Sequence, residues 1–347
     1  MRPIGLLIAT FLAAMSALLP PPANCQSPSG AGAVDPTLVV EPIPSLLIAS
    51  GSLRSLAVAG DGRLFVLDAD NDRVVVFDTS GALLTTFGRS GRGPGEFSRP
   101  SALALGDSLL VVGDRNSRFT IFGLDGSYRN SFVIPRIRFM NSDLVVVGDS
   151  LVAVGGFVEG AGKAINGRLL HLVTIDGLRV GDAVPLSQSA LDANSFTVSG
   201  ASVALQHDSL WVIQPTEYTL SRVGLDGSET TRTLSLRPEY YRPPVRKEPP
   251  VSRTAEWTQW LRGFDHPQKV FALNDSMVVV SVVLMAQIPS RYSIDFINTR
   301  SGEIVYSFID DERVCGVDTT NNTLFFEGEY VPDEQMMEVR RYRVVYR

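Results

Sequence analysis

A turn-and-strand unit recurs along the chain, and it constrains the fold more than any other feature of the sequence. A polar turn precedes a short apolar strand in "GDGRLFVLD" from Gly60, "GDSLLVVGD" from Gly106, "GDSLVAVGG" from Gly148, "HDSLWVIQP" from His207 and "NDSMVVVSV" from Asn274. A weaker copy, "NNTLFFEGE", begins at Asn321. Such self-similarity along a chain is the signature of a repeat architecture.

A second turn follows each of the first five units. It reads "FDTSGALLTTF" from Phe77, "FGLDGSYRNSF" from Phe122, "TIDGLRVGDAV" from Thr174, "VGLDGSETTRTL" from Val223 and "INTRSGEIVYSF" from Ile297. Asp-Gly and Ser-Gly pairs suit tight hairpins because glycine adopts positive φ without a Cβ clash. Four antiparallel strands in about 40–50 residues are typical of a propeller blade.

Six such units are present. Their approximate spans are 50–88, 89–135, 136–190, 191–240, 265–310 and 311–347. The last unit has only three clear strands, and the apolar segment Thr37–Ala49 precedes the first. We expect this segment to supply the missing outer strand, because that pairing covers an exposed edge and closes the ring. The predicted fold is an all-β, six-bladed β-propeller over residues 37–347.

The loop "RSGRGPGEFSRP", residues 89–100, carries three closely spaced glycines and could be taken for a phosphate-binding loop. Phosphate loops open a helix, whereas Pro94, Pro100 and two apolar strands occupy the corresponding positions here. The run "GRGPGEFSRP…GDSLLVVGDRNSRFTIFGLDG" instead resembles an NHL repeat, and "LFVLDADNDRVVVFDTSG" resembles its second half. The resemblance covers residues 54–135. It implies a bacterial, exported, six-bladed propeller in which the glycine loop connects two blades.

The first 25 residues are typical of a secretory signal peptide. Arg2 is followed by an almost wholly apolar run, and small residues precede a predicted cleavage site before Gln26. Residues 26–36 are then a flexible segment, and the protein is periplasmic or secreted. Lipid anchoring through Cys25 is less favoured, because Pro22 and Asn24 do not suit a lipobox. The apolar run is shorter than the ~20 residues of a stable membrane span.

Charge and cysteine content exclude two further classes. The formal net charge is −6 and no basic run offsets it, so nucleic acid is not an expected partner. Cys315 is the only cysteine beyond the signal peptide, which leaves no intrachain disulfide. We expect Cys315 in the core and the protein as a monomer.

The insertion 237–267, between the fourth and fifth blades, is the main candidate for binding. Its first half is proline-rich and basic, and "VSRTAEWTQWLRGF" predicts a short helix. Connectors between blades lie on the same face as the loops at which propellers usually bind ligands. The predicted ligand-binding residues are Tyr240, Tyr241, Arg242, Trp257, Trp260 and Arg262, since aromatic rings and guanidinium groups suit anionic or peptide ligands. The alternative is that the helix plugs a gap, with both tryptophans buried.

No catalytic residues are predicted. A G-x-S-x-G motif is absent, and His171, His207 and His266 belong to unrelated parts of the repeat. The primary prediction is therefore a cofactor-free, non-catalytic module that binds a protein, a peptide or a small anionic ligand.

The alternative is a metal-dependent hydrolase or lyase, since the resemblance extends to propeller lactonases and lyases that hold a divalent cation in the central channel. Its metal candidates are Asp68, Asp114, Glu217 and Glu327. The repeat gives Asp68 and Asp114 equivalent positions, so turn capping is the competing interpretation for these two.

Overall fold

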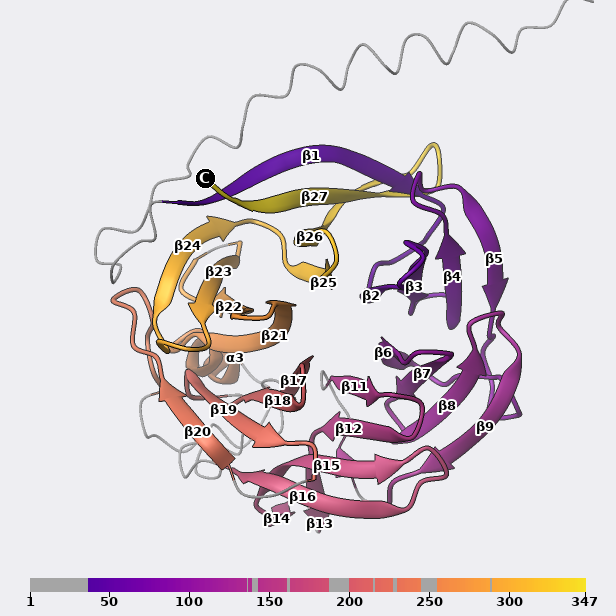
Figure 1. Cartoon of the computed structure of the whole chain (residues 1–347), viewed down its shortest axis with the longest axis horizontal. Coiled ribbons are helices and arrows are strands. Elements are labelled where there is room, and N and C mark those ends of the chain that lie inside the picture. Colours follow the sequence, from indigo (N-terminus) through magenta and orange to yellow (C-terminus); the bar gives the residue numbers. More distant parts are fainter. Residues whose placement is uncertain are drawn as a thin grey trace, which may run out of the picture.

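The computed structural model is a six-bladed β-propeller, with the blades arranged around a central axis (Figure 1). It describes residues 37–135, 137–138, 143–160, 163–186, 200–214, 216–226, 230–244, 255–287 and 289–347. The signal peptide, Cys25 and the flexible segment 26–36 lie outside the described residues, so they remain predictions. No helix within the described ranges is long and apolar enough to cross a membrane.

In the first five blades the strands follow one another in sequence order from the axis outwards. Blade 1 contains β2 (Ser55–Val58), β3 (Leu64–Asp68), β4 (Arg73–Phe77) and β5 (Leu83–Phe87). Blade 2 contains β6 (Pro100–Leu105), β7 (Leu109–Asp114), β8 (Arg118–Gly123) and β9 (Tyr128–Val133). Blade 3 contains β11 (Leu144–Val147), β12 (Leu151–Gly155), β15 (Arg168–Thr174) and β16 (Arg179–Pro185).

The second half of the ring repeats this order. Blade 4 contains β17 (Ser202–Gln206), β18 (Ser209–Ile213), β19 (Thr219–Gly224) and β20 (Thr230–Ser235). Blade 5 contains β21 (His266–Asn274), β22 (Met277–Leu284), β23 (Arg291–Asn298) and β24 (Ile304–Asp310). Blade 6 contains β25 (Val314–Asp318), β26 (Thr323–Val331), β27 (Met336–Tyr346) and, outermost, β1 (Leu38–Ile48).

The core lies between neighbouring blades. Every residue of β3 and of β22 is buried, because both faces of a middle strand meet an adjacent blade. Between blades 1 and 2, Phe65 and Val76 pack in one cluster with Leu110 and Phe122. The continuous apolar runs that define the repeat are therefore strands buried on both faces, whereas the outer strand β5 is largely exposed.

The N-terminal strand closes the ring, as the sequence predicts. β1 pairs antiparallel with β27, from Leu38 opposite Tyr346 to Ile48 opposite Met337. The register shifts once along this pairing, and there the Nε of Arg341 donates to the carbonyl of Pro44 at 2.7 Å. The first strand and the last are thus held in one blade although they lie at opposite ends of the described chain.

The glycine-rich loop is a blade connector, and several of its polar groups bond to one another and to blade 2. The Glu96 carboxylate accepts hydrogen bonds from the Gly93 amide at 2.7 Å and from the Arg89 Nε at 2.9 Å. The guanidinium of Arg118 in blade 2 donates to the carbonyls of Arg92 and Gly93, at 2.6 and 2.9 Å. These bonds join the connector to the blade that it enters.

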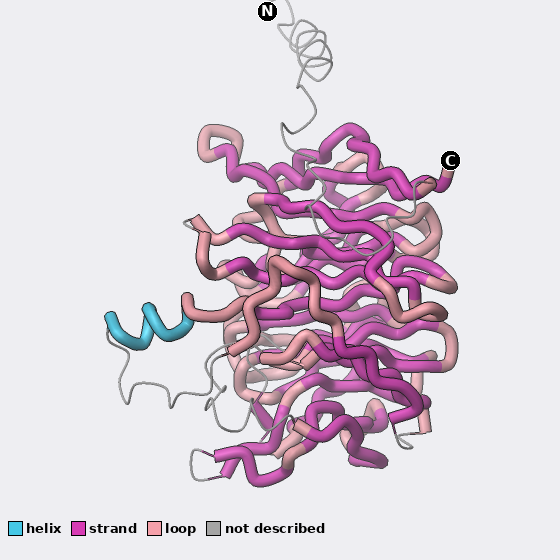
Figure 2. The backbone as a smooth tube through the Cα atoms, turned by 90° about the vertical axis from the view of Figure 1, so that its left-hand side faces the viewer, coloured by secondary structure: helices cyan, strands magenta, loops and turns pink. Residues whose placement is uncertain are grey.

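The strand order gives the ring two different faces. The connectors and the loops between the second and third strands of each blade share one face, here called the connector face. The short hairpin turns share the other, the turn face. Helix α3 (Ala255–Leu261) projects from the connector face (Figure 2), in the stretch where the sequence predicts a helix.

A small sheet within blade 3 was not predicted. The order is β10 (Ile137–Arg138), β13 (Phe157–Gly160) and β14 (Lys163–Asn166). It joins the connector before blade 3 to the loop between the second and third strands of that blade. Its hairpin "FVEGAGKAIN" has no run of apolar residues, so the sequence pattern does not identify it as paired strand.

Because β1 closes the ring, truncation of Ile48, its last residue, is expected to destabilise the protein strongly. Ile48 is fully buried and packs with residues of blades 1 and 6, so Ile48→Ala is expected to lower the free energy of unfolding by about 3 kcal/mol. Leu84→Ala on β5, where the side chain is 52% exposed, serves as the control and should cost less than about 1 kcal/mol. Urea unfolding measures both, and equal costs would contradict a structural role for the closing strand.

Candidate ligand-binding site

The insertion between blades 4 and 5 is anchored first by Tyr240. Its hydroxyl donates to the carboxylate of Asp295, and so does the hydroxyl of Tyr218. Ser293 and Ser307 donate to the other oxygen of Asp295, at 2.8 and 2.6 Å. Burial raises the pKa of Asp295, and burial together with this carboxylate raises the pKa of both tyrosines well above the usual value. Four hydroxyl donors therefore satisfy one fully buried carboxyl group. Tyr240 joins the insertion to Asp295 of blade 5, which also binds Tyr218 of blade 4.

Arg242 provides the second anchor. Its guanidinium binds the carboxylate of Asp265 in a forked arrangement, at 2.7 and 3.2 Å, and its backbone amide donates to the same group at 3.0 Å. Asp265 is buried and also accepts the amide of Met285 at 3.0 Å. The insertion has a proline-rich first limb, which includes residues 237–244, and a helical second limb, from α3 to Pro267. The ion pair joins both limbs to blade 5, so the guanidinium of Arg242 is engaged within the protein.

The helical limb is fastened at its C-terminal end. Trp260 is half-buried and packs edge-on against Phe264 with ring centroids 5.0 Å apart, and Phe264 packs in the same way on His266 at 4.3 Å. The Nε2 of His266 lies 3.3 Å from the carbonyl of Leu261. Burial lowers the pKa of His266 to about 4, so the ring is neutral at pH 7.

The other two residues predicted on this limb differ from Trp260. Arg262 is exposed at the end of α3, whereas the side chain of Trp257 lies outside the described residues. Packing against Phe264 therefore explains the buried part of the Trp260 side chain. The exposed side chain of Arg262 has no such packing role.

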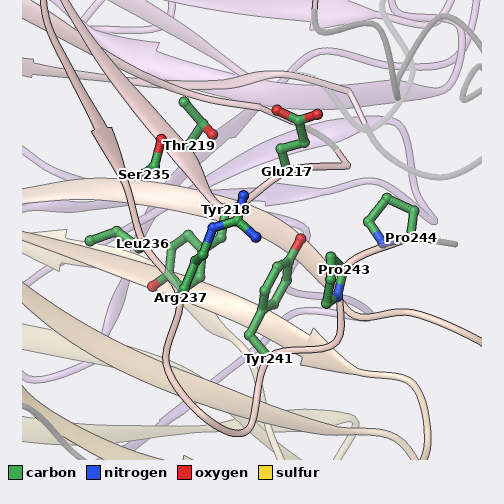
Figure 3. Close-up of a pocket in the computed structure, with 9 residues that line it drawn as sticks. All are labelled: Glu217, Tyr218, Thr219, Ser235, Leu236, Arg237, Tyr241, Pro243 and Pro244. Atoms are coloured by element: carbon green, nitrogen blue, oxygen red, sulfur yellow. The ribbon is translucent and has the colours of Figure 1, made fainter.

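A cavity of about 200 Å³ lies between the first limb and blade 4 (Figure 3). It is lined by Glu217, Tyr218, Thr219, Ser235, Leu236, Arg237, Tyr241, Pro243 and Pro244. The Tyr241 hydroxyl donates to the carbonyl of Thr216 at 3.1 Å, and its ring packs against Tyr218. Arg237 is exposed and Glu217 half-buried. The cavity thus combines an aromatic wall, one guanidinium, one carboxylate and two prolines.

Two larger cavities, of about 390 and 430 Å³, are less suited to binding. The first lies on the turn face, where Asp149 accepts the Ser108 amide at 3.0 Å. The second surrounds Asp114 and Arg118. Asp176, the other carboxylate of the first cavity, accepts the hydroxyl of Thr174, and Asp114 accepts the Asn116 amide at 2.8 Å. The carboxylates of both cavities are thus already engaged within the protein.

Two of the metal candidates are turn caps. Asp68 is fully buried and accepts the Nε of Arg73 and the Nδ2 of Asn71, both at 2.9 Å, and the amide of Gly51 at 3.3 Å. Asp114 likewise accepts the Asn116 amide at 2.8 Å. The turn-capping interpretation of the repeat is confirmed.

The other two candidates lie in different blades. Glu217 lines the cavity beside blade 4, and Glu327 pairs with Arg313 at 2.8 Å in blade 6. Over the described part of the chain, no three His, Cys, Asp or Glu side chains are grouped so that they could hold a metal ion. The four candidate carboxylates are therefore not brought together into one site.

The histidines and the cysteine also lie apart. His171 is buried in β15 with Nδ1 2.7 Å from Asp182, His207 lies in a hairpin turn of blade 4, and His266 starts β21. Cys315 is buried, as predicted, and burial raises the pKa of its thiol. A raised pKa favours the protonated thiol at neutral pH, as is usual for a cysteine packed in a core.

Comparison with known proteins supports the architecture. A family model described as "6-bladed beta-propeller" matches residues 50–143. A member of the duf4221 family from Bacteroides vulgatus shares 11% identity and a TM-score of 0.62, covering 90% of this chain and 99% of its own. A Bacteroides fragilis protein provisionally described as exported shares 12% identity and a TM-score of 0.58, with 91% and 97% covered. No curated protein matches. At these identities the likeness establishes the fold, that of bacterial propellers, and leaves the NHL resemblance a prediction.

The Asp295 network predicts a severe destabilisation. Asp295→Ala removes the acceptor of four buried hydroxyls, which is expected to cost about 3 kcal/mol or more. Asp70→Ala, at an exposed carboxylate in a turn of blade 1, is the matched control, with an expected change below about 0.5 kcal/mol. Chemical denaturation compares them, and a near-neutral Asp295→Ala would show that the hydroxyls find other partners.

The buried His266 predicts acid sensitivity. Its folded-state pKa is about 4 against an ordinary 6.5, so the unfolded chain binds the extra proton. The contribution of His266 to the free energy of unfolding is therefore fully present above pH 6.5. About 3 kcal/mol of it is lost as the pH falls to 4. Urea unfolding of wild type and His266→Gln at pH 7 and pH 4 isolates this contribution. Equal losses in the two proteins would rule it out.

Proposed function

We propose that the protein is an exported, non-catalytic binding module that holds a peptide segment of a partner protein on its connector face. The observation that carries the proposal is the cavity of about 200 Å³ beside Tyr241 and Arg237. Propellers serve many functions, so the argument depends on this site and the fold alone does not decide it.

The position of the site residues is set before any ligand arrives. Tyr240 and Arg242, on either side of Tyr241, are held by the buried carboxylates of Asp295 and Asp265. These anchors fix the backbone that presents the Tyr241 ring. Preorganisation of this kind favours binding, because less conformational freedom is lost when the ligand docks.

The chemistry of the lining favours an extended peptide. The Tyr241 ring and the prolines Pro243 and Pro244 give rigid apolar contact, and Arg237 and Glu217 offer one charge of each sign. The guanidinium of Arg237 suits a side-chain or terminal carboxylate. We expect the protein to bind as a monomer and without a cofactor.

Separate observations support export and a non-catalytic function. The predicted signal peptide and the provisional description of the Bacteroides fragilis protein favour export. The hydrolase or lyase alternative lacks a comparable observation. Asp68, Asp114 and Glu327 are bonded to protein groups, and they lie, like Glu217, in separate blades or loops.

The proposal is tested by selecting displayed random peptides on residues 26–347 and measuring the affinity of the selected peptides by fluorescence anisotropy. Tyr241→Ala and Arg237→Ala are each expected to weaken binding at least about tenfold, as is common for central aromatic and arginine contacts. Binding should persist in EDTA, because no metal takes part.

The control is Arg300→Ala, at an exposed arginine on the turn face of blade 5, which should leave the affinity unchanged. Selected peptides that bind Tyr241→Ala and Arg237→Ala as tightly as wild type would place the binding surface elsewhere. Loss of binding in EDTA, recovered by a divalent cation, would favour the metal-dependent alternative.

A further inference from the structure

The outer edge of blade 4 presents open backbone groups beside the cavity that Tyr241 lines. Among the strands that the structure describes, β20 is the outermost of this blade and pairs with β19 alone (Figure 1). Its last residue, Ser235, lines the cavity next to Thr219 of β19 (Figure 3). The edge of a sheet accepts an extended peptide as an additional strand, because it offers amide and carbonyl groups at regular intervals.

The hydrogen bonds around β19 show which groups of β20 are open. The amide of Leu236 donates to the carbonyl of Tyr218 at 2.8 Å. The carbonyl of Thr219 accepts the amide of Gln214 at 3.0 Å, so it faces away from β20. Bonded and non-bonded pairs alternate along an antiparallel ladder, and Thr219 and Ser235 are therefore a non-bonded pair. The amide and the carbonyl of Ser235 thus point to the outer edge.

The same alternation opens the backbone of Thr233. This residue lies two positions before Ser235 and opposite Ser221 of β19. Over the ranges that the structure describes, the backbone of Thr233 and Ser235 bonds to no segment beyond blade 4, and both side chains are exposed. The edge therefore offers two successive pairs of amide and carbonyl groups to a ligand.

The side chains of β20 do not protect this edge. Charged residues usually protect an exposed edge strand from pairing. Arg232 is the one charged residue of β20, and its guanidinium donates to two carbonyls in a turn of blade 5, at 2.6 and 2.9 Å. Leu234 packs in the apolar cluster between blades 4 and 5. The uncharged Thr233 and Ser235 are on the other face, since side chains alternate along a strand.

We propose that the peptide held in the cavity continues along β20 as a fifth strand of blade 4. This inference rests on the proposed function, and it adds the conformation of the ligand and the groups that bind its backbone. The peptide residue beside Ser235 places its side chain on the face that Ser235 shares with Thr219, which is the face of the cavity. The peptide residue two positions along lies beside Thr233.

The geometry also describes the partner segment. The ring of Tyr241 and two prolines line the cavity, so the residue beside Ser235 is apolar or aromatic. The rest of the segment lies along an uncharged edge and needs residues that favour an extended strand, such as valine, isoleucine or threonine. Proline is excluded wherever the peptide amide faces β20, because it has no N–H to donate.

The first test is an N-methyl scan of the tightest displayed peptide whose binding Tyr241→Ala weakens. Each amide of the peptide is methylated in turn, and its affinity for residues 26–347 is measured by fluorescence anisotropy. Within the paired segment, methylation of every second residue is expected to weaken binding at least about fivefold, because it removes a hydrogen bond to β20. The intervening amides point to solvent, so their methylation should change the affinity by less than about twofold.

The second test removes an amide of the protein. Thr233→Pro loses an outward N–H without breaking the ladder to β19, and it should weaken the same peptide at least about fivefold. Thr233→Val keeps the amide and should bind within about twofold of wild type. Val133→Pro, on the exposed outer strand of blade 2, controls for proline at a blade edge and should also bind within about twofold.

The outcomes separate strand addition from the proposed function. A peptide that depends on Tyr241 but shows no alternation in the scan overturns strand addition and leaves the proposed function in place. Equal affinities of folded Thr233→Pro and Thr233→Val have the same consequence. The scan uses the wild-type protein, so it decides the matter if Thr233→Pro does not fold. A selection that yields no peptide dependent on Tyr241 overturns both proposals.

Discussion

Burial of apolar strands between neighbouring blades is the interaction on which the rest of this structure depends. Strands such as β3 and β22 are buried on both faces, so each blade needs a neighbour on either side. Only a closed ring provides two neighbours for every blade. β1 completes blade 6 and packs Ile48 among residues of blades 1 and 6, which makes closure a requirement for stability in every blade.

Buried carboxylates hold the loops of the connector face in place against these packed blades. Asp68 and Asp114 tie turns and connectors together within the repeat, whereas Asp265 and Asp295 anchor the insertion that departs from it. Each of these carboxylates is buried and satisfied by several donors. The consequence is a face whose loops are held in defined positions, as a binding surface requires.

Only part of the proposed peptide site could be found from the sequence. Tyr241 belongs to the insertion that interrupts the repeat, and the prediction of a binding segment came from that interruption and from its aromatic and basic residues. In the sequence, nothing distinguishes the neighbouring Tyr240 and Arg242 from Tyr241 as ligand contacts. In the structure, their polar atoms bind the carboxylates of Asp295 and Asp265. Arg237, Pro243 and Pro244 line the cavity beside them. Which residue anchors and which one lines a cavity depends on partners from other blades.

The sequence by itself determined the number of blades, the closing role of the N-terminal strand and the role of the glycine loop as a blade connector. These features depend on local patterns of turns and apolar runs. The tertiary structure alone decided which charged residues of different blades pair near the axis. Asp143 and Lys269 belong to blades 3 and 5 and share no motif, and they lie 2.8 Å apart only because a ring brings the starts of all inner strands to one axis. Long-range electrostatics of this kind leaves no trace in local sequence.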